Sequence, residues 1–176
     1  MKNSFFRYAT GLIPFIALCS CAFAQTNKLG SPLNFPTTKE LAYADDSNAG
    51  PISSINEKAV KSFSKSYSKQ SNAAWFALED GFVAVFTEDG IKTKAFYDRK
   101  GRPAGEVRTY QEDKLPKDIR HMVKSTYYDF TIFLVNEVTV GNAKVHLIKI
   151  EDQTSFKTIR VQDGEMTETE AFIKSK

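Results

Sequence analysis

The chain has 176 residues, of which 12% are aromatic and 26% are charged, and its formal net charge is +3. This length allows one domain with a substantial core, or two small repeats that share one core. A charge so close to neutral gives no electrostatic reason to expect nucleic acid or an anionic membrane as a partner.

Residues 1–24 have the three parts of a secretory signal peptide. Lys2 and Arg7 precede a short apolar run, and a small-x-small sequence ending at Ala24 follows it. The run is shorter than the roughly 20 apolar residues that span a bilayer. We therefore expect export to the periplasm or beyond, with cleavage before Gln25 and no transmembrane segment in the mature chain. The remaining 152 residues would carry 22 basic and 21 acidic side chains, a net charge of +1.

The cysteines allow a second processing route. The sequence Leu18-Cys19-Ser20-Cys21 resembles a lipoprotein box, in which Cys21 would be lipidated and become the first mature residue. Cys19 is an unusual occupant of such a box, so cleavage before Gln25 is the preferred reading and a lipid anchor at Cys21 the alternative. These are the two cysteines of the chain, so the mature protein would have no disulfide and no thiol nucleophile.

Residues 25–54 are polar and interrupted by proline and glycine, most densely between Asp45 and Pro51. No hydrophobic period extends through them, so we expect a flexible, largely disordered N-terminal tether.

The first periodic segment follows this tether. Ser54 and Glu57 fit a capping box at a helix start, and Val60, Phe63 and Tyr67 then recur at helical spacing. The pattern predicts an amphipathic helix over residues 55–70.

The hydrophobic period then changes to two, which indicates strands. Four aromatic and β-branched runs are expected as an antiparallel meander: 74–78, 82–86, 91–97 and 104–110. Asp89-Gly90 fits a hairpin turn, because glycine accepts the positive φ that such turns require. Trp75, the one tryptophan, is interpreted as a core residue under the first helix rather than as a binding anchor.

The same order of elements occurs again in the second half. Pro116 and Asp118 suit a helix start, and four strand-like runs follow: 131–140, 144–150, 155–161 and 166–173. The order predicts an α+β fold of tandem units, each a helix plus a four-stranded antiparallel sheet, at 55–112 and 113–176 of one compact domain. We interpret the units as an internal duplication.

The sequence lacks the groups that catalysis or a cofactor needs. His121 and His146 are the two histidines, and their spacing does not place two metal ligands on one helical face. Both are interpreted as surface or boundary residues. No Gly-x-Ser-x-Gly elbow or glycine-rich phosphate loop occurs. We expect no enzyme activity, no metal and no cofactor.

A sheet that is covered by helices on one side leaves its other face available for a partner. Strand alternation places Lys92, Lys94 and Phe96 on one face of their strand, and Arg108 and Tyr110 on one face of the next. Because interfaces favour aromatic and cationic side chains, these five residues are the candidate partner-binding face. A solvated sheet face with incidental aromatics is the alternative interpretation.

Several of these residues form a recurring pattern. They are Val60, Phe63, Tyr67, Trp75, Ala84, Phe86, Asp89-Gly90, Tyr97-Asp98-x-x-Gly101, Leu115-Pro116-x-x-Ile119, Val123 and Tyr127. Over residues 55–173 this pattern resembles the PepSY-like family of exported bacterial proteins, which is related in fold to beta-lactamase inhibitory protein. The resemblance implies tandem helix-on-sheet units that bind, and in some cases inhibit, another protein such as a hydrolase.

The leading hypothesis is therefore an exported, non-enzymatic binding module for another exported or envelope protein, with hydrolase inhibition as its narrower form. No inhibitory loop of the family can be matched residue by residue. The alternative is a structural or sensory domain of the cell envelope that binds a small ligand or a cell-wall fragment, which a deep apolar pocket would favour.

Overall fold

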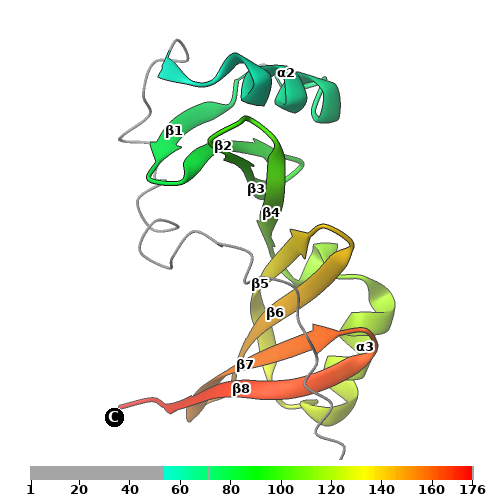
Figure 1. Cartoon of the computed structure of the whole chain (residues 1–176). Coiled ribbons are helices and arrows are strands. Elements are labelled where there is room, and N and C mark those ends of the chain that lie inside the picture. The colour runs from blue at the N-terminus through cyan, green and yellow to red at the C-terminus, as the bar shows by residue number, and fades with distance from the viewer. Residues whose placement is uncertain (1–53, 71, 176) are drawn as a thin grey trace, which may run out of the picture. The chain divides into compact units, whose positions relative to one another are not determined.

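The computed structural model describes residues 54–70 and 72–175, which form two α-helices and eight strands in the order of Figure 1. The first group is α2 (Glu57–Ser66), β1 (Ala74–Leu78), β2 (Gly81–Glu88), β3 (Ile91–Asp98) and β4 (Pro103–Tyr110). The second is the 3-10 helix η3 (Glu112–Lys114), α3 (Lys117–Thr126), β5 (Thr131–Val140), β6 (Ala143–Glu151), β7 (Ser155–Gln162) and β8 (Glu165–Ile173). The predicted signal peptide and its processing lie outside the described residues, as does the predicted tether apart from Ser54.

All eight strands belong to one antiparallel sheet in the order β1 to β8. The prediction of four-stranded units is therefore only partly right, because β4 and β5 pair directly, with Arg108 opposite Glu137 and Tyr110 opposite Val135. Pairing satisfies the backbone groups that two separate sheets would expose at these edges. The boundary between the two predicted units remains an interpretation.

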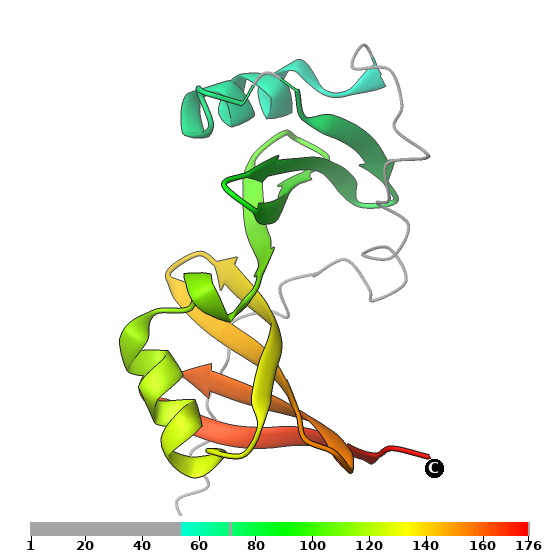
Figure 2. The ribbon, with the colours of Figure 1, turned by 180° about the vertical axis from the view of Figure 1, so that it is seen from behind.

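Both helices pack on the same face of this sheet. Cross-strand partners share a face of a sheet. Ala95 on β3 is the partner of Glu106 on β4, which is in turn the partner of Thr139 on β5, so these three residues lie on one face. The buried side chains under both helices belong to this face. We call it the helix-bearing face and the opposite one the helix-free face; Figure 2 shows the ribbon from behind.

Each helix covers its own half of the sheet with a cluster of apolar side chains. Phe63 of α2 contacts Trp75 and Phe86 edge-on, with ring centroids 5.4 and 5.5 Å apart. Trp75 is 3% exposed, which confirms its predicted place in the core. Val123 of α3 packs in the second cluster, with Ile148 of β6, and both are fully buried.

The start of α2 differs from the predicted capping box. Asn56 is the N-cap, and its side chain accepts a hydrogen bond from the backbone N–H of Lys58. The Asn56 amide also donates to the carbonyl of Arg99, 3.1 Å away in the β3–β4 turn. This second contact explains the choice of cap, because it ties the helix start to a turn that is distant in sequence.

Gly101 lets that turn approach the helix closely. Its φ is +77°, and a Cβ at this position would lie 2.6 Å from the backbone nitrogen of Ala59. Gly101 also closes the turn by donating to the carbonyl of Asp98 at 2.8 Å. The Asp-x-x-Gly sequence is thus needed both for turn geometry and for helix packing.

Candidate functional site

The structure separates the five predicted site residues onto two faces. Lys92, Lys94 and Phe96 lie on the helix-free face, whereas Arg108 and Tyr110 lie on the helix-bearing face. The register shift between Phe96 and Tyr97 belongs to the same pairing of β3 with β4. A shift of one residue exchanges the two faces of a strand, which the alternation within single strands does not reveal.

Arg108 and Tyr110 belong to a buried polar cluster around Glu137. The Glu137 side chain is 5% exposed and accepts hydrogen bonds from Tyr110 Oη at 2.8 Å and Arg108 Nη1 at 3.5 Å. Lys144 Nζ lies 2.7 Å from Glu137 Oε1. His146 Nε2 lies 3.4 Å from Oε2 but is not aligned as a hydrogen bond, and it has no other hydrogen-bond partner among the described residues.

These neighbours favour the ionised form of Glu137. His146 is the largest influence, and with Lys144 and Tyr110 it holds the pKa of Glu137 well below its usual range, although burial opposes this. Burial, followed by the hydrogen bond to Glu137, raises the pKa of Tyr110. His146 is 5% exposed, so the prediction of a surface or boundary position is wrong for this residue. The cluster is a fixed network of compensated charges that joins β4 to β5 and β6.

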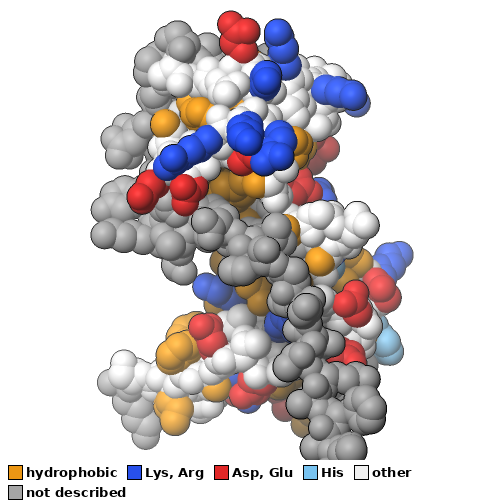
Figure 3. Space-filling view, viewed as in Figure 1, with side chains coloured by type: hydrophobic (Ala, Val, Ile, Leu, Met, Phe, Trp, Pro, Cys, Tyr) orange, Lys and Arg blue, Asp and Glu red, His pale blue; other side chains and the backbone are white. Residues whose placement is uncertain are grey.

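The helix-free face of β5–β8 carries an exposed group of aromatic side chains. Phe133, Phe156 and Phe172 are 36%, 39% and 62% exposed. The rings of Phe133 and Phe156 are 6.0 Å apart at an angle of 74°, and Phe172 is the cross-strand partner of Phe156. Figure 3 shows hydrophobic side chains at the surface beside the C-terminal end of β8. We call these three residues the aromatic patch.

One cationic side chain contacts the aromatic patch, and two others lie on the same face. Lys174 Nζ lies 4.4 Å from the centre of the Phe156 ring and also pairs with Glu151 at 2.8 Å. Lys149 and Arg160 lie on the same helix-free face, where their cross-strand partners are Leu134 and Leu147, respectively. Directed charge around rigid apolar area is the composition that protein interfaces favour.

Sequence reasoning missed the aromatic patch, and of the polar cluster it identified Arg108 and Tyr110 but not Glu137 at its centre. Phe156 shares a face of its strand with Arg160, and the buried Ile159 and Val161 are on the other face. An aromatic side chain on the polar face of a predicted strand could therefore have indicated the patch. Glu137 gave no such signal, because its partners on β4 and β6 depend on the register.

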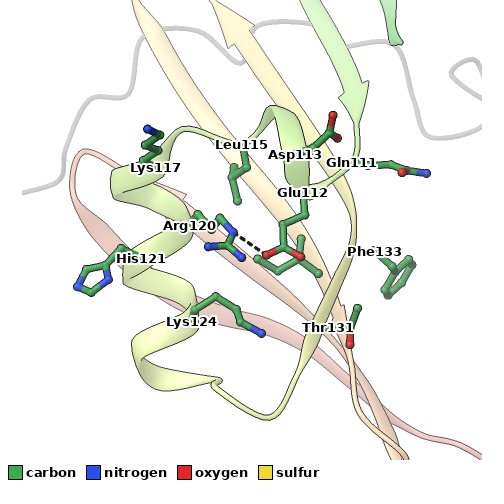
Figure 4. Close-up of a pocket in the computed structure, with 11 residues that line it drawn as sticks. Gln111, Glu112, Asp113, Leu115, Lys117, Arg120, His121, Lys124, Thr131 and Phe133 are labelled. Atoms are coloured by element: carbon green, nitrogen blue, oxygen red, sulfur yellow. Dashed lines mark hydrogen bonds and ion pairs between the residues drawn. The ribbon is translucent and has the colours of Figure 1, made fainter.

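A hollow of about 1050 Å³ lies between η3, α3 and the start of β5 (Figure 4). Two of the cationic side chains that line it already have partners. Arg120 pairs with Glu112 at 2.7 Å, and Lys124 donates to the carbonyl of Phe130 at 2.5 Å. It therefore gives no support to a deep apolar ligand pocket.

A second hollow, of about 260 Å³, adjoins Tyr67 and Glu106, whose side chains are hydrogen-bonded to each other at 2.5 Å. Within residues 54–70 and 72–175, no group of three or more histidine or acidic side chains could hold a metal ion. No helix in this part of the chain is both long and apolar enough to cross a membrane.

The fold is similar to solved structures of Bacteroides proteins. A DUF2874 family protein from Bacteroides uniformis is 15% identical with a TM-score of 0.55, over 68% of this chain and 89% of that chain. A BLIP-like protein from Bacteroides fragilis is 14% identical with a TM-score of 0.57, over 73% and 91%. A Bacteroides eggerthii protein, provisionally described as periplasmic, is 14% identical with a TM-score of 0.55, over 68% and 88%.

No family model matches the sequence, and no curated protein does. Identities of 14% to 15% show a common fold and nothing about partners. Because one of these structural neighbours is a BLIP-like protein, the resemblance to beta-lactamase inhibitory protein is confirmed at the level of fold.

Proposed function

We propose that this protein is an exported, non-enzymatic binding module that holds another secreted or envelope protein against the helix-free face of β5–β8. The aromatic patch carries the proposal. Exposed aromatic side chains grouped on one face are typical of an interaction site, because they add apolar surface that water solvates poorly.

The geometry of the patch favours a protein over a cell-wall fragment. A sugar ring stacks on a flat aromatic surface, whereas the Phe133 and Phe156 rings meet edge to face at 74° and together form no flat platform. Side chains of a protein partner can pack against such a pair, and Lys149 and Arg160 can meet polar groups on the same face. Hydrolase inhibition is the narrower form of this proposal, supported by the BLIP-like fold alone.

The proposal is tested with two variants of the full chain. Phe156→Ala/Phe172→Ala removes most of the patch, while Tyr128→Ala removes an aromatic side chain that is 75% exposed elsewhere. Partners recovered with the wild-type chain from the exported fraction of its own host are identified and then titrated in purified form. We expect the double variant to weaken binding by about 30-fold or more, as loss of a hot spot of about 2 kcal/mol predicts.

Tyr128→Ala should bind like the wild type, and both variants should keep the wild-type melting temperature within a few degrees. A partner that binds the double variant and the wild type equally would refute the proposed surface. Addition of the purified chain to that partner, where it is a hydrolase, tests the inhibitory form by its turnover rate.

A further inference from the structure

Residues 131–134 at the start of β5 form a free strand edge within the sheet. β4 pairs with β5 from Glu106, opposite Thr139, to Tyr110, opposite Val135, and after Tyr110 the chain leaves the sheet as η3. Within the described part of the chain, no residue hydrogen-bonds to the backbone of 131–134 on the side where β4 would continue. The unpaired backbone groups of such an edge can pair with a further strand.

The hollow between η3, α3 and β5 lies beside this edge. Thr131 and Phe133 are among the residues that line it, and both are exposed. Its volume of about 1050 Å³ reaches the upper end of the range of ligand pockets. A short extended stretch of another chain can therefore reach the edge from solvent.

The two sides of the edge differ in chemistry. Arg120 and Lys124 of α3 point toward β5 on one side, whereas Phe133 points away from α3 on the other (Figure 4). Glu112 already neutralises Arg120 at 2.7 Å. Lys124 Nζ donates to the backbone carbonyl of Phe130 at 2.5 Å, which carries no charge. Among the described residues, Lys124 therefore keeps a positive charge that no carboxylate balances.

A β-bulge sets the position of Phe133. The register of β5 with β6 passes from Ile132 directly to Leu134, so Phe133 is the additional residue of the bulge. Bulges redirect side chains at sheet edges. The Phe133 ring lies 6.0 Å from that of Phe156, so the free edge is continuous with the aromatic patch.

We propose that the partner held against β5–β8 adds an extended segment to the free edge at residues 131–134, with acidic and apolar residues at alternate positions. Successive side chains of a strand point to opposite faces. An acidic side chain of this segment meets Lys124, and the apolar side chain next to it in sequence meets Phe133. This mode of binding rests on the proposed function, because the segment belongs to the same partner.

A short synthetic peptide in which glutamate and valine alternate is the probe. It is titrated into the full chain, and two-dimensional NMR follows the backbone amides. The control peptide has the same composition, with all glutamates before the valines. We expect the alternating peptide to shift the amide signals of residues 131–134. The control peptide should bind about tenfold more weakly, because a block sequence cannot match both sides of the edge at once.

Variants of the chain test the two contacts. Lys124→Glu should weaken binding of the alternating peptide by about tenfold or more, since attraction becomes repulsion. Lys65→Glu is the matched control, because Lys65 is the basic residue in the last turn of α2 as Lys124 is in that of α3; it should bind like the wild type. Phe133→Ala keeps the contact of Lys124 with Phe130 and should weaken binding by about fivefold, so it also provides the test if Lys124→Glu does not fold.

Equal binding of the two peptides, shifts confined to signals other than those of residues 131–134, or equal effects of the Lys124 and Lys65 variants would each overturn the proposed strand addition. Dimers that form through this edge in analytical ultracentrifugation would overturn it as well. The proposed function fails by a different result, in which the partner binds Phe156→Ala/Phe172→Ala as tightly as the wild type.

Discussion

Replacement of Glu137 by glutamine tests whether the buried polar cluster stabilises the join between β4 and β5. The substitution keeps the size of the side chain but removes its charge and one of its two accepting oxygens. Tyr110 and Lys144, which lie 2.8 and 2.7 Å from different carboxylate oxygens, can then no longer both be satisfied.

The size of the effect follows from burial. Hydrogen bonds to a charged group contribute about 1.5–3 kcal/mol each, and removal of one partner from a buried ion pair costs about 3–5 kcal/mol. Glutamine keeps one acceptor, and the Lys144 and Arg108 side chains are 52% and 35% exposed, so water partly replaces the lost partner. We expect Glu137→Gln to lower the free energy of unfolding by about 2–4 kcal/mol at pH 7.

Urea unfolding of wild type and variant between pH 7 and pH 2 measures this difference. Because folding lowers the pKa of Glu137, its contribution is fully present above the unfolded pKa of about 4.3 and is lost as the pH falls toward the folded pKa. The two proteins should therefore differ most at neutral pH and converge in acid.

Glu88→Gln is the control, because Glu88 is exposed at the end of β2 and should change stability by less than about 0.5 kcal/mol. A Glu137→Gln variant within about 0.5 kcal/mol of wild type at pH 7, or a difference that does not shrink in acid, would refute this account of the cluster.

Two further substitutions probe contacts of the first half. Gly101→Ala should destabilise by about 2–4 kcal/mol, since the new Cβ would lie 2.6 Å from Ala59 N in α2 and left-handed φ adds about 1–2 kcal/mol. Gly90 has a φ of +78° but nothing within 4 Å of an added Cβ, so Gly90→Ala measures the cost of the left-handed φ alone. Equal losses of stability for the two variants in thermal unfolding would contradict the proposed clash at Gly101. Tyr67→Phe, which removes the 2.5 Å hydrogen bond to Glu106, should cost about 1–2 kcal/mol in urea unfolding; unchanged stability would contradict it.

Local signals predicted the elements well. The strand predicted at 131–140 is β5 itself, and the other seven runs agree with their strands to within two residues at either end. Asp89 and Gly90 both have positive φ, which confirms the predicted hairpin turn, and Asp163-Gly164 between β7 and β8 has the same geometry. Hydrophobic period and turn chemistry act over a few residues, so one sequence is enough to reveal them.

Relations between strands could not be predicted in the same way. The pairing of β4 with β5 spans η3 and α3, and nothing local in Arg108 or Glu137 specifies that they are opposite each other. The candidate site depended on this missing information. Lys94 and Arg108 each have a well-defined face within their own strand, but only the register shows that the two faces are opposite.

The join between β4 and β5 reverses the usual distribution of polar residues. Its helix-bearing face holds the Glu137 cluster, whereas its helix-free face holds Val107 and Val138, which are cross-strand partners. Val138 pairs in turn with Val145, so an apolar row crosses the join on the helix-free face, next to the polar pair Thr109 and Asn136, which are hydrogen-bonded at 2.9 Å. The surface proposed for a partner on β5–β8 can therefore extend along this row to Val107 of β4, with the Thr109 and Asn136 side chains as its polar neighbours.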